Sequence, residues 1–185
     1  MKVLVNCEYS GIVREAFRKR GHDAWSCDLL PAEDGSPYHI QADAIEVAYS
    51  RPWDLMIAHP PCTHISVSGA RHFAAKIADG RQDEALDFVW NLMQAPIEQI
   101  GVENPISIIS TRIRKPDQII QPWMFGHGET KATCLWLKNL PKLTPTNIVE
   151  GREARIHKMA PGPNRWKDRS RTYIGIADAM AKQWG

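Results

Sequence analysis

The sequence predicts an α/β fold, a Rossmann-like doubly wound sheet with mostly parallel strands. Short apolar runs typical of buried strands recur along the chain, and amphipathic helical patterns stand between them. The strand-like runs lie at residues 2–7, 24–27, 53–58 and 97–102, and the helical patterns at 11–20 and 83–94. Strands that alternate with helices in this way favour a parallel sheet that is covered on both faces.

The second half of the chain is less regular. A short helix is expected at residues 44–49, with Asp43 as its N-terminal cap. One more strand is expected at 133–137 and a terminal helix at 173–184. The intervals 106–130 and 141–171 are rich in Pro and Gly, so we expect them to be irregular and loop-like.

Composition limits the class of protein. A chain of 185 residues forms one ordinary domain, here residues 1–185. The net charge of +2 permits contact with nucleic acid without requiring it. The four cysteines form no CxxC pair, which favours reduced thiols, and no segment approaches the ~20 apolar residues of a membrane span. We therefore expect a cytoplasmic protein with no membrane partner, and the sequence gives no oligomeric state.

The strand at 53–58 leads into the segment His59-Pro60-Pro61-Cys62, which places a cysteine at the ligand-binding edge of the sheet. Cys62 could be a buried structural residue, which is common for a lone cysteine. It could also bind a metal with His59 and His64, but no distal Cys/His pair has suitable spacing, and the second cysteine of a zinc deaminase motif is absent. The basic residues around the loop favour a thiolate, so nucleophilic catalysis is the preferred interpretation and no metal is expected.

The next strand along the chain ends at Glu103-Asn104-Pro105. Because parallel strands end at the same edge, Glu103 should lie near Cys62. Glu103 could simply cap the next turn. Alternatively, burial could raise the pKa of its carboxyl, so that Glu103 protonates or hydrogen-bonds a ring nitrogen.

Three strand ends suggest a site for a nucleoside-containing cofactor. The turn after the first strand contains Cys7, Glu8 and Gly11, and it leads to a helix N-terminus, although an ordinary β–α turn is an equal alternative. Asp28 ends the second strand, where such folds bind ribose hydroxyls. Asp43 could accept a hydrogen bond from an adenine amino group, and each aspartate could instead be a cap or a solvated residue.

Basic residues are concentrated in two stretches, 112–115 and 152–171. The first contains Arg112, and the second contains Trp166 among several cations. Such a mixture suits phosphate contact and base stacking, although a solvated loop is the competing interpretation.

With these elements in order, the sequence resembles the cytosine-C5 DNA methyltransferase family along nearly its whole length. The most specific likeness is Pro60-Pro61-Cys62 with Ser66, followed by Glu103-Asn104, which are similar to the family's nucleophile and Glu-Asn motifs. Amino-methyltransferases carry an aromatic residue where Cys62 stands. The cofactor turn departs from the family at Cys7, Tyr9 and Ile12, and Thr63 replaces the usual glutamine.

The resemblance implies S-adenosylmethionine as cofactor and DNA as partner. Cys62 would add to C6 of cytosine, and Glu103 would hold N3 while C5 is methylated. Lys131 or Arg112 would hold the base carbonyl or a phosphate. Cofactor contacts would fall to Cys7, Glu8, Gly11, Asp28, Asp43 and the backbone near Pro60.

The family's target-recognition domain is replaced here by the basic region 138–171. This difference leaves two alternatives to methylation of duplex DNA. One is the same chemistry on single-stranded or free pyrimidine nucleotides. The other is a non-catalytic module that binds nucleic acid.

Overall fold

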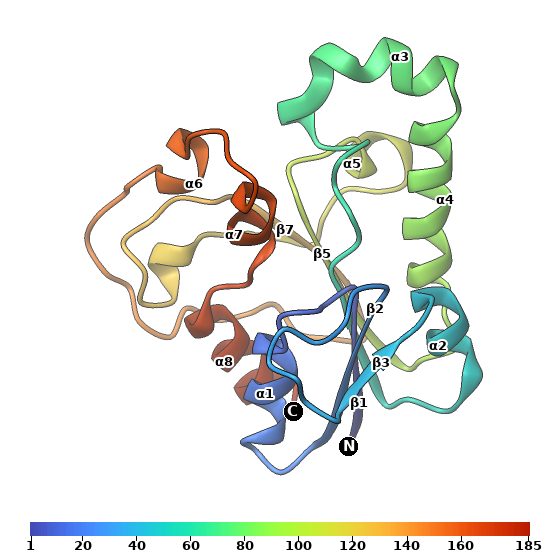
Figure 1. Cartoon of the computed structure of the whole chain (residues 1–185). Coiled ribbons are helices and arrows are strands. Elements are labelled where there is room, and N and C mark those ends of the chain that lie inside the picture. The colour runs from blue at the N-terminus through green and yellow to red at the C-terminus, as the bar shows by residue number, and fades with distance from the viewer.

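The computed structural model describes all 185 residues and contains one seven-stranded sheet in the order β3-β2-β1-β4-β5-β7-β6 (Figure 1). The strands are β1 (Lys2–Asn6), β2 (Asp23–Asp28), β3 (His39–Gln41), β4 (Leu55–Ala58), β5 (Gln99–Pro105), β6 (Gln118–Ile120) and β7 (Thr133–Lys138). Only β7 runs antiparallel to its neighbours. The predicted Rossmann-like, mostly parallel sheet is therefore confirmed.

The helices connect these strands and cover both faces of the sheet. They are α1 (Ile12–Arg18), α2 (Ala44–Ser50), α3 (Phe73–Ala78), α4 (Arg81–Met93), α5 (Ile109–Arg112), α6 (Arg155–Lys158), α7 (Arg165–Ser170) and α8 (Ile174–Gln183). Two 3₁₀ segments lie at Val67–His72 and Pro122–Met124. No helix is both long and apolar enough to cross a lipid bilayer.

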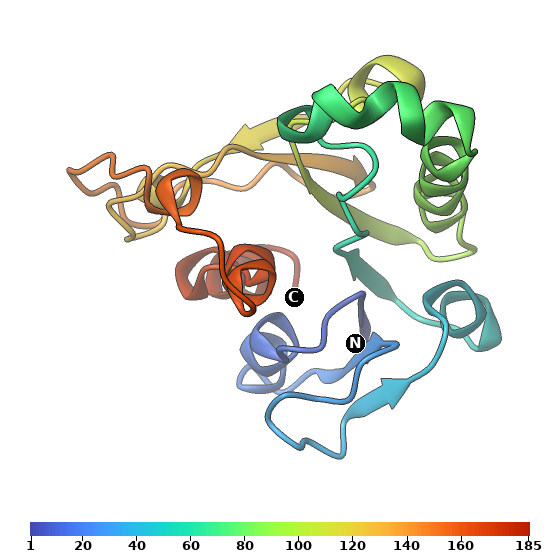
Figure 2. The same ribbon diagram turned by 45° about the horizontal axis from the view of Figure 1, so that its top comes forward.

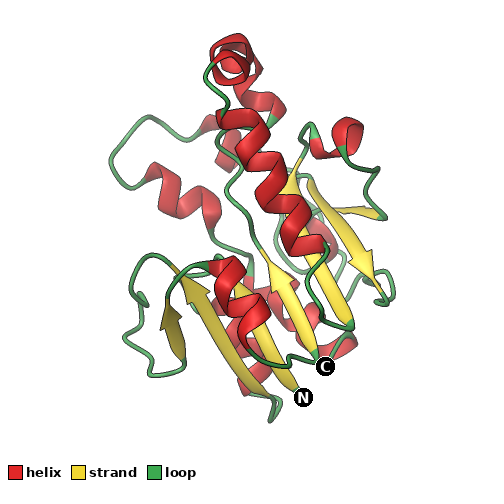
Figure 3. Cartoon of the chain, turned by 90° about the vertical axis from the view of Figure 1, so that its right-hand side faces the viewer, coloured by secondary structure: helices red, strands yellow, loops and turns green.

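The side chains of each strand alternate between two separate apolar cores. Leu4 and Met56 point into a core shared with α2 and α4, which cover one face. Val5 and Ile57 point into a second core shared with α1 and α8 on the opposite face. Figure 2 shows this three-layer arrangement, and Figure 3 shows α4 crossing the face of the sheet. A fully buried sheet needs such continuous apolar strands.

The intervals expected to be irregular contain short elements. Residues 106–130 include α5 and β6, and residues 141–171 include α6 and α7, so those two expectations were wrong in part. β3 was not anticipated either, and it pairs with β2 over three residues only. Elements of three to six residues carry too little periodicity to be recognised, because tertiary pairing rather than local propensity determines them.

Gly175 fixes the packing of α8 against the loop after the second 3₁₀ segment. Its backbone N–H donates to His127 Nε2 at 3.0 Å. A Cβ at this position would lie 1.9 Å from the carbonyl oxygen of Phe125, which is backbone and cannot rotate away. Only glycine allows α8 to approach this closely.

We therefore predict that Gly175→Ala destabilises the protein by about 1–3 kcal/mol, the usual cost of overpacking. Gly162→Ala is the matched control, because a Cβ there would meet nothing within 4 Å. Urea unfolding followed by circular dichroism measures both free energies. Equal stability of the two variants would contradict the packing argument.

Candidate functional site

The parallel strands β1, β4 and β5 end side by side and bring three chain segments together. Asn6 pairs with Ala58, and Ala58 pairs with Val102 in the next strand. The register continues past the strand ends, because the backbone N–H of His59 donates to the carbonyl of Asn6 at 3.0 Å. The turn after β1, the loop after β4 and the end of β5 thus form one edge, as expected for ligand sites in such sheets.

A buried amide fixes the loop that carries Cys62. The side chain of Asn104, at the end of β5, donates from Nδ2 to the carbonyl oxygen of Pro60 at 2.8 Å. The carbonyl of Cys62 in turn accepts backbone N–H groups from Ile65 and Ser66, at 3.2 and 2.9 Å. The structure therefore places Cys62 in a tight turn that is attached to the strand bearing Glu103.

Glu103 forms a buried pair with His59. His59 Nδ1 lies 2.8 Å from Glu103 Oε2, and the two side chains are 9% and 13% exposed. Burial alone raises the pKa of Glu103, but the hydrogen bond and positive charge of His59, with the charge of Lys131, lower it overall. The expectation of a raised pKa for Glu103 was wrong, because the sequence did not reveal its partner.

The thiol of Cys62 is also not activated in this state. Burial raises the pKa of Cys62, and the negative charge of Glu103 raises it further. The positive charges of Lys131 and Arg169 oppose this shift without overcoming it. The expectation that basic neighbours favour the thiolate was therefore wrong, because a buried carboxylate and desolvation outweigh the nearby cations.

The two cations named from the sequence lie in different places. Lys131 lines a cavity together with Glu103, and its Nζ donates to the carbonyl oxygen of Arg169 at 2.9 Å. Arg112 lies at the end of α5, where its exposed guanidinium is 3.6 Å from Asp83 on α4. The structure thus brings Lys131 to the candidate catalytic group, and it gives Arg112 a surface partner instead.

The turn after β1 is shaped by left-handed backbone and by a buried carboxylate. Cys7 has φ of 58° and Gly11 has φ of 71°. Glu8 accepts the backbone N–H groups of Val13 at 2.7 Å and of Arg14 at 3.2 Å. Glu8 therefore caps the N-terminus of α1, because its carboxylate accepts backbone N–H groups that Gly11, which has no side chain, cannot bind.

Asp28 and Asp43 approach Cys7 from the neighbouring strand ends. Burial raises the pKa of the Cys7 thiol, and the charges of both aspartates raise it further. Oδ1 of Asp28 accepts the backbone N–H of Leu30 at 2.9 Å. Asp43 caps α2 by accepting from Ile45 and Glu46, as its capping interpretation predicted. Both aspartates thus lie close enough to Cys7 for their charges to act on its thiol.

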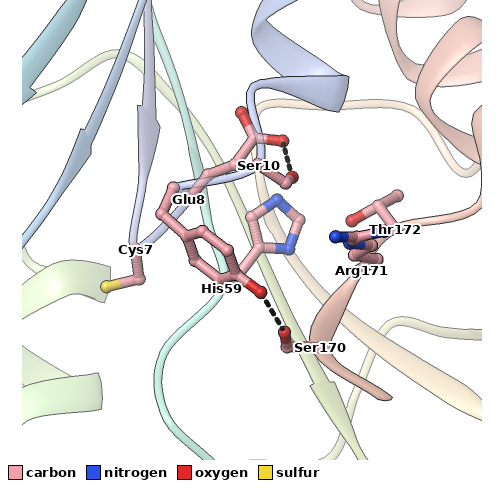
Figure 4. Close-up of a pocket in the computed structure, with 8 residues that line it drawn as sticks. Cys7, Glu8, Ser10, His59, Ser170, Arg171 and Thr172 are labelled. Carbon is pink, nitrogen blue, oxygen red and sulfur yellow. Dashed lines mark hydrogen bonds between the residues drawn. The ribbon is translucent and has the colours of Figure 1, made fainter. Parts of the chain in front are cut away.

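Two small cavities open along this edge. The first lies between the turn after β1 and the segment Ser170–Thr172 (Figure 4), and it is lined by Cys7, Glu8, Tyr9, Ser10, His59, Ser170, Arg171 and Thr172. The second is lined by Glu103, Lys131, Thr133, Thr172, Tyr173 and Ile176. His59 and Glu103, one in each lining, are hydrogen-bonded to each other, so the cavities adjoin.

The basic segment folds back over the turn after β1. The ring of Trp166 lies 5.7 Å from that of Tyr9, and the Tyr9 hydroxyl is 3.4 Å from Ser170 Oγ. Arg171 forms an ion pair with Glu33 at 2.5 Å. These contacts were not predicted from the sequence.

His59 is the main residue that sequence reasoning did not assign to this site. The sequence suggests His59 only as a metal ligand or as a basic neighbour of Cys62. Its signal was its position, because it is the first residue after a fully buried strand and precedes two prolines. At such a position, an ionisable side chain points to the ligand edge of the sheet.

Comparisons with known proteins give the fold and no closer relationship. No protein-family model matches the chain, and no curated protein sequence matches it. Among solved structures it is similar to a "putative DNA modification methyltransferase" encoded within an E. coli prophage, with a TM-score of 0.53 and 13% identity. The match covers 81% of this chain and 52% of that one, so the chain spans about half the length of its structural neighbour. The likeness shows a shared Rossmann-like fold.

The charge arrangement predicts how readily Cys62 reacts with an alkylating agent. Glu103→Gln should shift the pH midpoint of Cys62 alkylation by iodoacetamide to lower pH, because the carboxylate that raises the thiol pKa is gone. Lys131→Gln should shift the midpoint to higher pH. Peptide mass spectrometry separates Cys62 from the other three cysteines, and Asp83→Asn on exposed α4 serves as control. Shifts in the opposite directions would contradict the assignment.

Proposed function

We propose that this chain is an S-adenosylmethionine-dependent methyltransferase that acts on C5 of cytosine in DNA through a covalent bond to Cys62. One observation carries the proposal. A cysteine and a carboxylate from two parallel strands are fixed at the same sheet edge by the bond from Asn104 to the Pro60 carbonyl. Addition to a pyrimidine ring needs a nucleophile and a group that holds the ring nitrogen, and this edge supplies both.

The residues beside this edge fit a nucleoside-containing cofactor. Asp28 and Asp43 supply carboxylates near Cys7, and carboxylates accept hydrogen bonds from ribose hydroxyls and an adenine amine. Nε2 of His59 is buried and has no protein partner, and His59 lines the cavity beside this turn. When bound, the cofactor would supply an electrophilic methyl group on a sulfonium.

The chemistry at the base follows from the side chains. Cys62 gives its proton to solvent water, and its Sγ forms a bond to C6, which makes C5 nucleophilic. Glu103 donates a proton or a hydrogen bond to N3, and this stabilises the electron density that the addition pushes onto the ring. After C5 has gained the methyl group, it gives its proton to solvent water. The electrons of that C–H bond re-form the C5–C6 double bond, and Sγ leaves C6 as a thiolate, so the cysteine is regenerated.

The high pKa of Cys62 in the free protein is compatible with this sequence of steps. Glu103 raises that pKa by its negative charge. When a base binds, the proton held between Glu103 and N3 offsets that charge, and Lys131 and Arg169 then favour the thiolate. The thiolate of Cys62 would thus form when the substrate binds and not in the free protein.

The basic segment supports a nucleic-acid substrate. Arg165, Lys167 and Arg169 of α7 surround Trp166, whose ring is half exposed. Cations interleaved with an aromatic ring suit phosphates and unstacked bases. The same segment contacts Tyr9 and Lys131 across the cavities, which also favours a second candidate, a single-stranded or free pyrimidine nucleotide.

The test is transfer of a labelled methyl group from S-adenosylmethionine to duplex DNA, single-stranded DNA, RNA and free cytidine nucleotides, with the product nucleosides identified by mass. We expect 5-methylcytosine in the duplex DNA lane. Product in the single-stranded or free-nucleotide lanes alone would support the second candidate. No product in any lane, from folded protein that binds DNA, would favour a non-catalytic binding module.

Cys62→Ser should abolish transfer, because a hydroxyl is a far weaker nucleophile than a thiolate, and it should leave cofactor affinity nearly unchanged. His72→Asn, an exposed histidine in the neighbouring 3₁₀ segment, is the control and should retain full activity. Oligonucleotides with 5-fluorocytosine should form a stable adduct with the wild type and none with Cys62→Ser. Turnover by Cys62→Ser would refute the covalent mechanism.

A further inference from the structure

Only one ring nitrogen of His59 has a hydrogen-bond partner in the protein. Nδ1 is bonded to Glu103 Oε2 at 2.8 Å, whereas Nε2 is buried and has no partner in the protein. Buried polar atoms in proteins usually have a hydrogen-bond partner, so a ligand or a water is expected beside this nitrogen. The open nitrogen belongs to a residue that lines the first cavity, between the turn after β1 and residues 170–172 (Figure 4).

The charges around His59 favour its protonated form. Burial alone lowers the pKa of His59, but the hydrogen bond and charge of Glu103, together with the charge of Glu8, raise it overall. Lys131 opposes this from the chain before β7, and Arg171 lines the same cavity. Two carboxylates from two strand ends thus flank one imidazole.

We propose that His59 is a positioning residue that holds Glu103 in place and carries the proton that Glu103 delivers to the ring nitrogen of the target pyrimidine. The inference rests on the proposed function. The proton on His59 Nδ1 passes to Glu103, and the electrons of that N–H bond stay on the imidazole. Glu103 then passes a proton to N3 of the base. Glu103 is a carboxylate before and after the transfer, and His59 becomes neutral. When Sγ leaves C6, the proton on N3 returns through Glu103 to His59.

This arrangement explains how an ionised carboxylate can act as an acid. The pKa of Glu103 is lowered, so Glu103 alone would hold no proton at neutral pH. The pair holds one proton in total, and the pair rather than either residue determines when it is lost. Because the pKa of His59 is raised, the proton is present at low pH and is lost as the pH rises through that pKa.

The protonation of His59 can be measured without any substrate. In protein labelled with ¹⁵N-histidine, His59→Asn identifies the His59 signals among the seven histidines. We expect both ring nitrogens of His59 to be protonated at pH 6.5, with a midpoint above that value. In Glu103→Gln the midpoint should fall below 6.5, since burial then dominates. A neutral His59 at pH 6.5, or an unchanged midpoint in Glu103→Gln, would overturn the proposal.

Kinetics distinguish a proton carrier from a structural support. His59→Asn keeps an amide donor toward Glu103 but has no proton to give. We expect kcat at pH 7.5 to fall about 10²–10⁴-fold, KM for both substrates to change little, and the fall in rate at high pH to move to lower pH. His59→Gln should behave alike, and His72→Asn should match the wild type.

The failure of this inference is distinguishable from failure of the proposed function. An active wild type whose rate and pH profile survive in folded His59→Asn and His59→Gln would overturn the role of His59 and leave the methylation proposal standing. A wild type that methylates no cytosine substrate overturns both.

Discussion

The hydrogen bond between His59 and Glu103 is the interaction on which the candidate site depends. It joins the ends of β4 and β5, and it connects a cavity beside the turn after β1 to a cavity beside Lys131. It also determines the ionisation of both partners, because each carries the charge that stabilises the other. A buried ion pair is costly unless it is well hydrogen-bonded, so its presence at a ligand edge favours a role beyond stability.

The same electrostatic arrangement raises the pKa of the Cys62 thiol in the free protein. A thiolate that is permanently exposed reacts with oxidants and electrophiles in general. Here the carboxylate that would engage the substrate also suppresses ionisation of the nucleophile. Under the proposed function, the site would couple formation of the thiolate to binding of a base, and the hydrogen bond from Asn104 to the Pro60 carbonyl attaches the Cys62 loop to the strand that bears Glu103.

Much of this could be predicted from the sequence, for a definite physical reason. The rule that parallel strands present ligand groups at their carboxyl ends was sufficient to place Cys62 and Glu103 on one edge and Cys7, Asp28 and Asp43 together. The protonation states could not be predicted, because the pKa of Glu103 depends on His59, which is 44 positions away in the sequence. Short elements such as β6 and α7 were missed since only tertiary contacts define them.

Thr172 lines both cavities, so a ligand in either cavity would contact the same short stretch of the chain. If a ligand in one cavity restricts the motion of this stretch, a ligand in the other cavity causes a smaller further loss of conformational entropy. Cofactor and target base would then bind with positive cooperativity, and linkage requires that each enhance the affinity of the other by the same factor.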